Sequence, residues 1–364
     1  MFEQARDFLA RAGWDGAVAV PLPGDASTRR YARLTQGDRH ALLMHQPQGA
    51  ETPAARPEAD AAERRALGYN AVARLAGADT RRFAAVADYL RGRGLSAPEI
   101  YAADHDAGLV LLEDMGDALY ADALAGGAPE DMLYDAAVAV LARLHAQAAP
   151  AQIAPGMPLH VYDETALLAE TDLLIDWFLP LALGRPATEG ERQAHRALWK
   201  AALDGLSQNR VPVHRDYHAQ NLLWLPARAG LARVGLIDFQ DAVAGSRAYD
   251  LVSLIEDARR DVPPDVAARA AAHYLAAMAA QGTPLDAEAF RAEMAVMAAQ
   301  RNAKIVGIFA RLYRRDGKPR YLALLPRVWA HLARDLSHPA LAGLRAWYDR
   351  TIPHEKRLPK EETV

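Results

Sequence analysis

The sequence predicts an α+β fold in two lobes, a small β-rich N-terminal lobe and a larger, mainly helical C-terminal lobe. Short apolar runs bounded by Gly, Asp and Pro dominate residues 17–115, as expected of strands. From residue 116 onward, long Ala- and Leu-rich segments repeat apolar residues at helical intervals. The 364 residues suffice for two or three folding units at roughly 150 residues each. We therefore expect one lobe over residues 1–115 and another over residues 116–364.

In the N-terminal lobe, strands and helices are predicted from apolar runs and from the turn residues that bound them. Apolar runs predict strands at residues 30–35, 39–46, 99–104 and 108–113. Between the second and third of these strands, a Pro- and Ala-rich stretch leads into an inserted helix over residues 58–75. Apolar spacing then predicts the main helix of this lobe at residues 81–93.

The C-terminal lobe is predicted from its helical periodicity. The expected helices span residues 130–148, 164–183, 189–207, 249–261, 264–281 and 286–313. Two short strands, at residues 222–225 and 233–237, flank a turn at 226–230. This hairpin should place Asn221 and Asp238 on neighbouring stretches of backbone.

Composition excludes several classes of function. Hydrophobic residues make up 51% and charged residues 24%, as in globular proteins. With a net charge of −4, the chain lacks the excess of basic residues typical of a nucleic-acid binder, so nucleic acid is not an expected partner. The absence of cysteine excludes disulfides and thiolate chemistry. No signal-like N-terminus or membrane-length apolar run occurs, so we expect a cytoplasmic protein without a membrane partner; its oligomeric state is not predicted.

The most informative motif is Val-His-Arg-Asp-Tyr-His-Ala-Gln-Asn at residues 213–221, with Asp238 following seventeen residues later at the end of a strand. Phosphoryl transfer needs one carboxylate to orient the attacking hydroxyl and two oxygen ligands to hold magnesium. Asp216 is the candidate base, and Asn221 and Asp238 are the candidate metal ligands. Four residues separate the Asp from the Asn, as in the kinase signature. A helix cap is the plainer alternative for Asp216 alone, but it does not explain the whole set.

For the residues around this motif, the sequence allows either a structural role or contact with the substrate. We expect His214 and Arg215 to brace the loop, and Asp250 to tie the following helix to it. Four polar residues lie close enough in sequence to be candidates for substrate contact, although a structural role is as plausible for each: His218, Gln220, Gln240 and Asp241.

The N-terminal lobe offers candidate nucleotide contacts. Hydroxyls, amides and guanidinium groups in one loop could bind phosphate: Ser27, Thr28, Arg29 and Arg30. The first lysine is Lys200, so the strand at 39–46 cannot supply a phosphate-pairing lysine, and the helix at 81–93 offers no glutamate to pair with one. Arg29, Arg30 or His45 would replace that charge, or magnesium would carry it alone. The hinge whose backbone meets adenine is expected after the last strand of this lobe, at Glu113, Asp114 and Met115.

Taken together, these residues resemble the aminoglycoside phosphotransferase and choline kinase superfamily, which shares the protein-kinase-like fold. The residues at 24–31, the lysine-free strand around Met44, and the segments 238–241 and 249–254 are similar to the bacterial anomeric sugar kinases of cell-wall recycling. Those enzymes phosphorylate N-acetylmuramate and N-acetylglucosamine on the C1 hydroxyl. The resemblance implies ATP and Mg²⁺ as cofactors, a small-molecule sugar as substrate and an α-1-phosphate product.

Three alternatives remain at this point. An aminoglycoside kinase would want an acidic pocket, whereas the C-terminal lobe carries several arginines on helices expected near the cleft, which favour a neutral or anionic acceptor: Arg259, Arg260, Arg311, Arg314 and Arg315. A choline kinase would need aromatic walls, and aromatic residues are only 7% of the chain. A non-catalytic nucleotide-binding protein would explain the missing lysine but not the presence of Asp216, Asn221 and Asp238.

Overall fold

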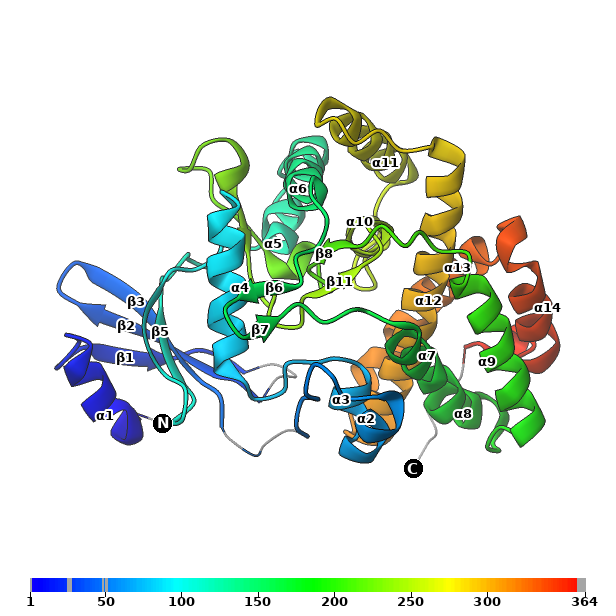
Figure 1. Ribbon diagram of the computed structural model, residues 1–364, viewed down its shortest axis with the longest axis horizontal. Helices are drawn as coiled ribbons and strands as arrows, with labels where there is room; N and C mark the ends of the chain where they lie inside the picture. Colours follow the sequence, from blue (N-terminus) through cyan, green and yellow to red (C-terminus); the bar gives the residue numbers. More distant parts are fainter. Residues whose placement is uncertain (1, 25–27, 48, 50–51, 359–364) are drawn as a thin grey trace. The chain divides into compact units, whose positions relative to one another are not determined.

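The computed structural model describes residues 2–24, 28–47, 49 and 52–358 (Figure 1). The chain forms two compact units, each built from separate pieces of sequence. The first unit contains Met1–Leu144, Pro150–His160 and Ala219–Val243. The second unit contains His145–Ala149, Val161–His218 and Ala244–Val364. The functional boundary expected at residue 115 stays a prediction.

A five-stranded antiparallel sheet organises the first unit, in the order β1-β2-β3-β5-β4. The strands are β1 (Val18–Pro21), β2 (Arg30–Gln36), β3 (Arg39–His45), β4 (Ile100–Asp104) and β5 (Leu109–Leu112). The four strands predicted from the sequence are confirmed. Strands β2 and β3 form a tight hairpin in register from Arg30 opposite His45 to Gln36 opposite Arg39. Gly37 turns this hairpin with a φ of 59°, which favours glycine.

Helix α1 (Phe2–Arg11) covers one face of this sheet (Figure 1). Phe8 and Leu9 pack with Trp14 against Leu34 and Leu43 of the sheet. Alternation along β2 and β3 points these sheet residues to one face, and burial of that face is the main stabilising contribution here.

The other helices of the first unit include one correction. The single helix expected over 58–75 is two short helices, α2 (Ala61–Leu67) and α3 (Tyr69–Val72). Gly68 separates them with a φ of 103°, a value outside the right-handed helical region. The main helix is confirmed as α4 (Thr80–Gly92), and α5 (Tyr120–Ala125) and α6 (Glu130–His145) follow. The predicted hairpin is present as β9 (Leu222–Trp224) and β10 (Val234–Leu236), and β6 (Gln152–Ala154) pairs with β7 (Met157–Pro158).

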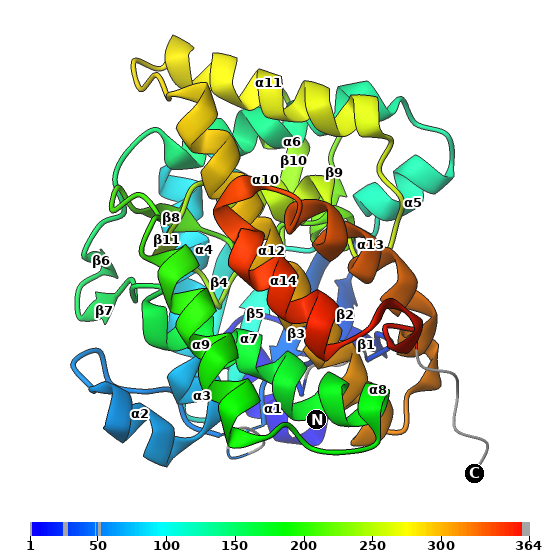
Figure 2. The same cartoon turned by 90° about the vertical axis from the view of Figure 1, so that its right-hand side faces the viewer.

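The second unit is mainly helical and is organised around one long helix, α12 (Figure 2). Helix α12 packs against α7, α10, α13 and the π-helical turn after α7. The helices of the second unit are α7 (Glu164–Leu173), the π turn Leu174–Phe178, α8 (Leu179–Leu183), α9 (Glu189–Leu203), α10 (Ala248–Ile255), α11 (Pro264–Ala280), α12 (Ala287–Arg314), α13 (Leu325–Asp335) and α14 (Ala342–Thr351). The short strand β8 (Val211–Val213) leads into the predicted catalytic loop, and the short strand β11 (Val243–Gly245) follows the segment after Asp238. In the described part of the chain, no helix combines the length and apolar character needed to cross a membrane.

Candidate active site

Strands β9 and β10 place the two candidate metal ligands of the first unit side by side. Asn221 immediately precedes β9, and Asp238 is the second residue after the end of β10. The backbone N–H of Ile237 donates to the carbonyl oxygen of Asn221 at 3.2 Å. The Asn221 amide nitrogen lies 3.4 Å from Oδ2 of Asp238. The predicted placement of these residues on neighbouring backbones is confirmed.

Asp238 has an unusual backbone and a cationic partner. Its φ is 62°, a conformation that non-glycine residues rarely adopt and that is found more often at functional sites. Arg29 donates to Oδ1 of Asp238 at 2.5 Å and to Oε1 of Gln240 at 2.6 Å. The Gln240 amide in turn donates to Asp238 at 3.1 Å. The structure therefore brings Arg29 to Asp238 and Gln240, which lie far from it in the sequence, and Asn221 is adjacent to Asp238.

Of the three residues that could replace the missing lysine charge, Arg29 is the one held at Asp238. Burial disfavours its charged form, but Tyr31 and Asp238, the latter hydrogen-bonded to it, raise its pKa above the ordinary value. Burial is the largest cause lowering the pKa of His45, so this imidazole is neutral at pH 7. Arg30 is exposed. Ser27 lies outside the described residues, and Thr28 accepts a hydrogen bond from the Gln46 amide at 2.8 Å.

Arg82, on α4, fixes the segment that follows Asp238. Its buried guanidinium donates to the carbonyl oxygens of Gln240 at 3.1 Å and Ala242 at 2.7 Å. The next residue, Phe83, stacks on Phe239 with ring centroids 5.0 Å apart. This role of Arg82 was not predicted from the sequence, where the signal is an arginine beside a phenylalanine near the start of the expected helix.

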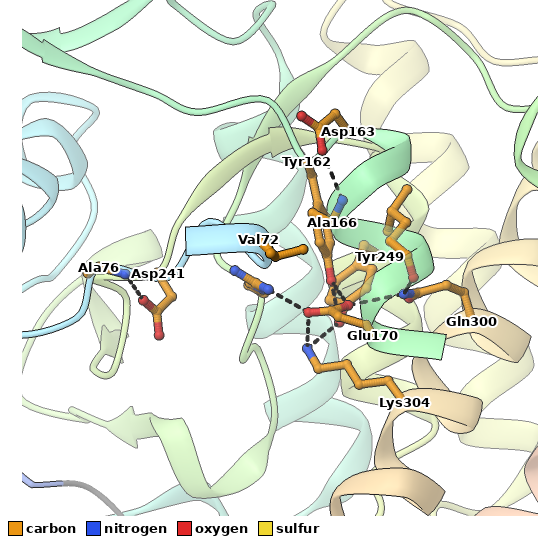
Figure 3. A network of polar contacts seen from close by, with 12 residues as sticks. Val72, Ala76, Tyr162, Asp163, Ala166, Glu170, Asp241, Tyr249, Gln300 and Lys304 are labelled. Atoms are coloured by element: carbon orange, nitrogen blue, oxygen red, sulfur yellow. Dashed lines mark hydrogen bonds and ion pairs between the residues drawn. The ribbon is translucent and has the colours of Figure 1, made fainter. Parts of the chain in front are cut away.

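Asp241 also helps to hold the segment after Asp238 in place. Its carboxylate accepts a hydrogen bond from the backbone N–H of Ala76 at 2.6 Å (Figure 3). This contact gives Asp241 a structural partner, and its role in substrate binding stays a prediction.

The expected hinge residues use their carboxylates in ion pairs. Glu113 accepts from Arg228 at 2.5 Å, and Asp114 accepts from Arg33 at 2.6 Å. Met115 is buried. These contacts hold the chain after β5 in place, and the contact of its backbone with adenine stays a prediction.

The loop that carries Asp216 belongs to the second unit and is anchored from two sides. The Asp250 carboxylate accepts from the backbone N–H groups of His214 at 2.6 Å and Arg215 at 2.8 Å. Arg215 has a φ of 81°, and its guanidinium donates to the buried carboxylate of Glu170 at 2.5 Å. The bracing roles predicted for His214, Arg215 and Asp250 are confirmed. Asp216 itself is partly exposed, as a residue that meets a substrate must be.

Two residues expected near the substrate differ in exposure. His218 is buried, and its backbone N–H donates to the carbonyl oxygen of Asp216 at 3.2 Å. Gln220 is exposed. Substrate contact by either residue stays a prediction.

Asn221 and Asp238 fit a magnesium ion by the chemistry of their donors. A carboxylate and a side-chain amide oxygen are hard ligands, and Mg²⁺ is commonly held by one or two protein oxygens together with phosphate oxygens and water. Their side chains are adjacent, and 37% of the Asp238 side chain is exposed. Which end of the Asn221 amide faces Asp238 is assigned by hydrogen bonding, so its oxygen can turn toward an ion.

Comparison with known proteins identifies the family. A family model described as "Phosphotransferase enzyme family" matches residues 18–285. The chain belongs to this family. It is thus a phosphotransferase of the kinase type, as the sequence predicts.

Two curated relatives match almost the whole chain. The N-acetylmuramate/N-acetylglucosamine kinase of Caulobacter vibrioides is 44% identical, and the match covers 96% of each chain. The kinase of the same name from Pseudomonas aeruginosa is 34% identical over 93% of this chain and 90% of its own length.

Solved structures share the fold at low sequence identity. A choline/ethanolamine kinase family protein from Mesorhizobium loti is 15% identical with a TM-score of 0.57, covering 94% of this chain and 99% of its own. The ADP-bound aminoglycoside phosphotransferase APH(2'')-Ib is 13% identical with a TM-score of 0.57, covering 94% and 98%. These similarities confirm the predicted α+β, protein-kinase-like fold class.

Proposed function

We propose that the protein is an ATP-dependent sugar kinase that phosphorylates the anomeric C1 hydroxyl of N-acetylmuramate, N-acetylglucosamine or both. The observation that carries this proposal is the 44% identity, over 96% of both chains, to a kinase named for these two sugars. The product would be a sugar 1-phosphate, which fits a role in recycling cell-wall sugars in the cytoplasm. The aminoglycoside and choline kinases among the solved structures support the fold alone, because they are too distant in sequence to indicate the acceptor.

In the proposed reaction, Asp216 orients the C1 hydroxyl and accepts its proton as the oxygen attacks the γ-phosphorus in line. The hydrogen bonds from the loop backbone to Asp250 and from Arg215 to Glu170 support this role, because they hold the loop in one conformation. The leaving group is ADP, and no covalent enzyme intermediate forms.

The nucleotide site is proposed in the lobe over residues 1–115, and catalysis and sugar binding in the lobe over 116–364. Asn221 and Asp238 would hold Mg²⁺, which supplies charge neutralisation at the phosphates. Arg29 adds a second positive charge, and the backbone around Met115 would meet the adenine ring. Further phosphate contacts are proposed from Ser27, Thr28 and Arg30, and sugar contacts from His218, Gln220, Gln240 and Asp241.

The acceptor can be tested directly. Purified protein is incubated with ATP, magnesium and one of four acceptors: N-acetylmuramate, N-acetylglucosamine, kanamycin or choline. ADP release and the phosphorus NMR spectrum of the product are followed. A sugar 1-phosphate signal with either amino sugar is expected. ADP release only with kanamycin or choline would reassign the acceptor, and no turnover with any of the four would favour the non-catalytic alternative.

The role of Asp216 gives a first prediction. Asp216→Asn should lower kcat by about 10²- to 10⁴-fold, the usual contribution of a general base, because the amide cannot accept the proton. Nucleotide affinity, measured by calorimetry, should stay within about threefold of wild type, since binding uses other groups. Asp176→Asn is a matched control, because that carboxylate is partly exposed and pairs with Arg192 at the surface. Turnover of the Asp216 variant near the wild-type rate would refute its assignment as the base.

A further inference from the structure

Arg82 is a buried arginine that joins α4 to two other parts of the first unit. It lies in the first turn of α4, and only 3% of the residue is exposed. Its guanidinium donates to three main-chain carbonyl oxygens, those of Pro158 at 3.0 Å, Gln240 at 3.1 Å and Ala242 at 2.7 Å. The planar fork of N–H donors fixes the direction of these carbonyls as well as their distance. One side chain therefore holds both the end of β7 and the segment 239–242.

The backbone of Asp238 depends on support from both sides. Its φ of 62° is one that a residue other than glycine keeps only when the surrounding structure holds it there. On the N-terminal side, the Ile237 N–H donates to the carbonyl oxygen of Asn221 at 3.2 Å. On the C-terminal side, Arg82 holds the carbonyl of Gln240. Loss of Arg82 would free the chain after Asp238 to relax.

A path of hydrogen bonds leads from Arg82 to the carboxylate of Asp238, with Gln240 in the middle. The main-chain oxygen of Gln240 accepts from Arg82, and its side-chain amide donates to Oδ1 of Asp238 at 3.1 Å. The other end of the same amide accepts from Arg29 at 2.6 Å. Gln240 is buried, so the placement of its main chain determines where its amide meets the carboxylate.

An aromatic contact provides a second link between α4 and this segment. Phe83 follows Arg82, Phe239 follows Asp238, and the two buried rings stack with centroids 5.0 Å apart. Stacked rings tolerate sliding, whereas hydrogen bonds to carbonyl oxygens are directional. We therefore attribute the orientation of the segment to Arg82 and its packing to the two rings.

We propose that Arg82 is a positioning residue for the metal ligand Asp238. It holds the segment 239–242, and through Gln240 it keeps the Asp238 carboxylate beside Asn221. This inference rests on the metal-binding role of Asn221 and Asp238 in the proposed function. Kinases of this fold usually link the corresponding helix to the site by a glutamate that pairs with a lysine. Helix α4 contains no glutamate, and Arg82 provides a different link.

The test measures metal affinity directly, with Mn²⁺ as the probe because it accepts the same oxygen ligands as Mg²⁺. Binding of Mn²⁺ to the protein–ADP complex is followed by electron paramagnetic resonance and needs no acceptor. Arg82→Met removes the donors and keeps a long side chain. Mn²⁺ affinity should fall about 10- to 100-fold, the usual effect of losing a partner that orients a metal ligand. ADP affinity in EDTA should stay within about threefold of wild type, since Arg82 acts on the metal ligand.

Turnover provides a second readout, with whichever acceptor the wild-type enzyme phosphorylates. In Arg82→Met, the magnesium concentration that gives half-maximal turnover should rise by the same factor of about 10 to 100. Saturating magnesium should bring kcat back to within about threefold of wild type, because the reacting groups are intact. Arg82→Lys keeps donors for some of the carbonyls, so its shift should be smaller than that of Arg82→Met.

Two variants of α4 serve as controls. Arg81→Met removes the preceding arginine, whose side chain is 55% exposed and pairs with Asp106. It should leave Mn²⁺ affinity unchanged. Leu90→Ala removes a buried apolar side chain and destabilises the same helix without removing a hydrogen bond. It should keep Mn²⁺ affinity within about threefold of wild type, as expected if the guanidinium and not the general stability of α4 orients Asp238.

Two results would overturn the proposal. One is a folded Arg82→Met variant whose Mn²⁺ affinity is within about threefold of wild type. The other is an equal loss of affinity in Leu90→Ala, because general loosening of α4 would then account for the effect. Thermal unfolding reports whether each variant folds. If Arg82→Met does not fold, Arg82→Gln, which keeps one donor group, takes its place.

Asp238→Asn separates this inference from the proposed function. Undiminished Mn²⁺ affinity in that variant would refute Asp238 as a metal ligand and the inference with it. Failure of the wild-type enzyme to phosphorylate either amino sugar would refute the proposed acceptor alone, because the Mn²⁺ measurement does not use one.

Discussion

At the scale of single residues, Arg29 is the proposed substitute for the phosphate-pairing lysine that the N-terminal part of the chain lacks. Kinases of this fold place a cation near the nucleotide phosphates. Here the Arg29 side chain is 14% exposed, and its guanidinium donates hydrogen bonds to Asp238 and Gln240. A cation already positioned beside a candidate metal ligand needs little rearrangement to interact with phosphate.

Replacing Arg29 should therefore weaken nucleotide binding. Because a hydrogen bond to a charged group contributes about 1.5–3 kcal/mol, Arg29→Met should raise the KM for ATP about 10- to 100-fold, with a smaller effect on kcat. Arg30→Met is the matched control, since Arg30 is the next residue and is exposed. ATP titrations of both variants at fixed magnesium provide the measurement. An equal effect of the two substitutions would contradict a specific role for Arg29.

Single residues also differ in whether their place in the candidate site can be predicted from the sequence. Asp216, Asn221 and Asp238 could be proposed from the sequence, because the chemistry assigned to them depends on short, fixed spacings. Glu170 and Arg82 are not recognisable in this way. Arg215 lies 45 residues from Glu170, and Arg82 lies 160 residues from Ala242, so these partners meet only in the folded chain.

At the scale of elements, periodicity predicts most helices and strands but not their irregularities. The helices expected at 264–281 and 286–313 correspond to α11 and α12. The helix expected at 164–183 is present, but it contains a π turn at Leu174–Phe178 that depends on packing rather than on local preference. The prediction missed four helices, α1, α5, α13 and α14, although α13 repeats apolar residues at helical spacing from Leu325 to Leu332.

The π turn marks a close approach between helices, and this gives a prediction. A Cβ atom added at Gly307 of α12 would lie 2.3 Å from the carbonyl carbon of Leu173 and 2.5 Å from the nitrogen of Leu174. Both atoms belong to backbone, so the helices would have to separate. Gly307→Ala should lower the free energy of unfolding by about 3 kcal/mol, the upper part of the range for overpacked cores.

Gly190→Ala is the matched control for that measurement. Gly190 lies in the first turn of α9, and an added Cβ there meets no atom within 4 Å. Alanine should be neutral or should stabilise the protein by up to about 1 kcal/mol, because it reduces the entropy of the unfolded chain. Urea denaturation of both variants, followed by circular dichroism, tests the comparison. Equal stability of the two variants would mean that α12 and the π turn adapt without cost.

At the scale of the whole molecule, the chain passes repeatedly between the two units. Residues 219–243 belong to the first unit although nearly 60 residues of the second precede them, and the catalytic motif is divided, with Asp216 in the second unit and Asn221 and Asp238 in the first. A local pattern cannot predict this arrangement, because periodicity describes an element and not the element against which it packs.

The first unit should therefore not fold from its N-terminal piece alone. Within this unit, the Leu236 N–H donates to the carbonyl oxygen of Ser96 at 2.7 Å, and Phe239 stacks on Phe83. A fragment of residues 1–144 lacks these partners. It also leaves the buried guanidinium of Arg82 without its acceptors, and each buried polar group that loses its partner costs about 1–3 kcal/mol.

We expect the 1–144 fragment to show no cooperative thermal transition by circular dichroism and poor dispersion in its amide NMR spectrum. A chain that joins residues 1–160 to 219–243 through a flexible Gly/Ser linker restores every piece of the first unit, and it should unfold cooperatively. Comparison of these two chains isolates the contribution of residues 145–160 and 219–243, because both contain the complete five-stranded sheet. A cooperative transition in the 1–144 fragment would show that the sheet and its helices fold without the strand pair that carries Asn221 and Asp238.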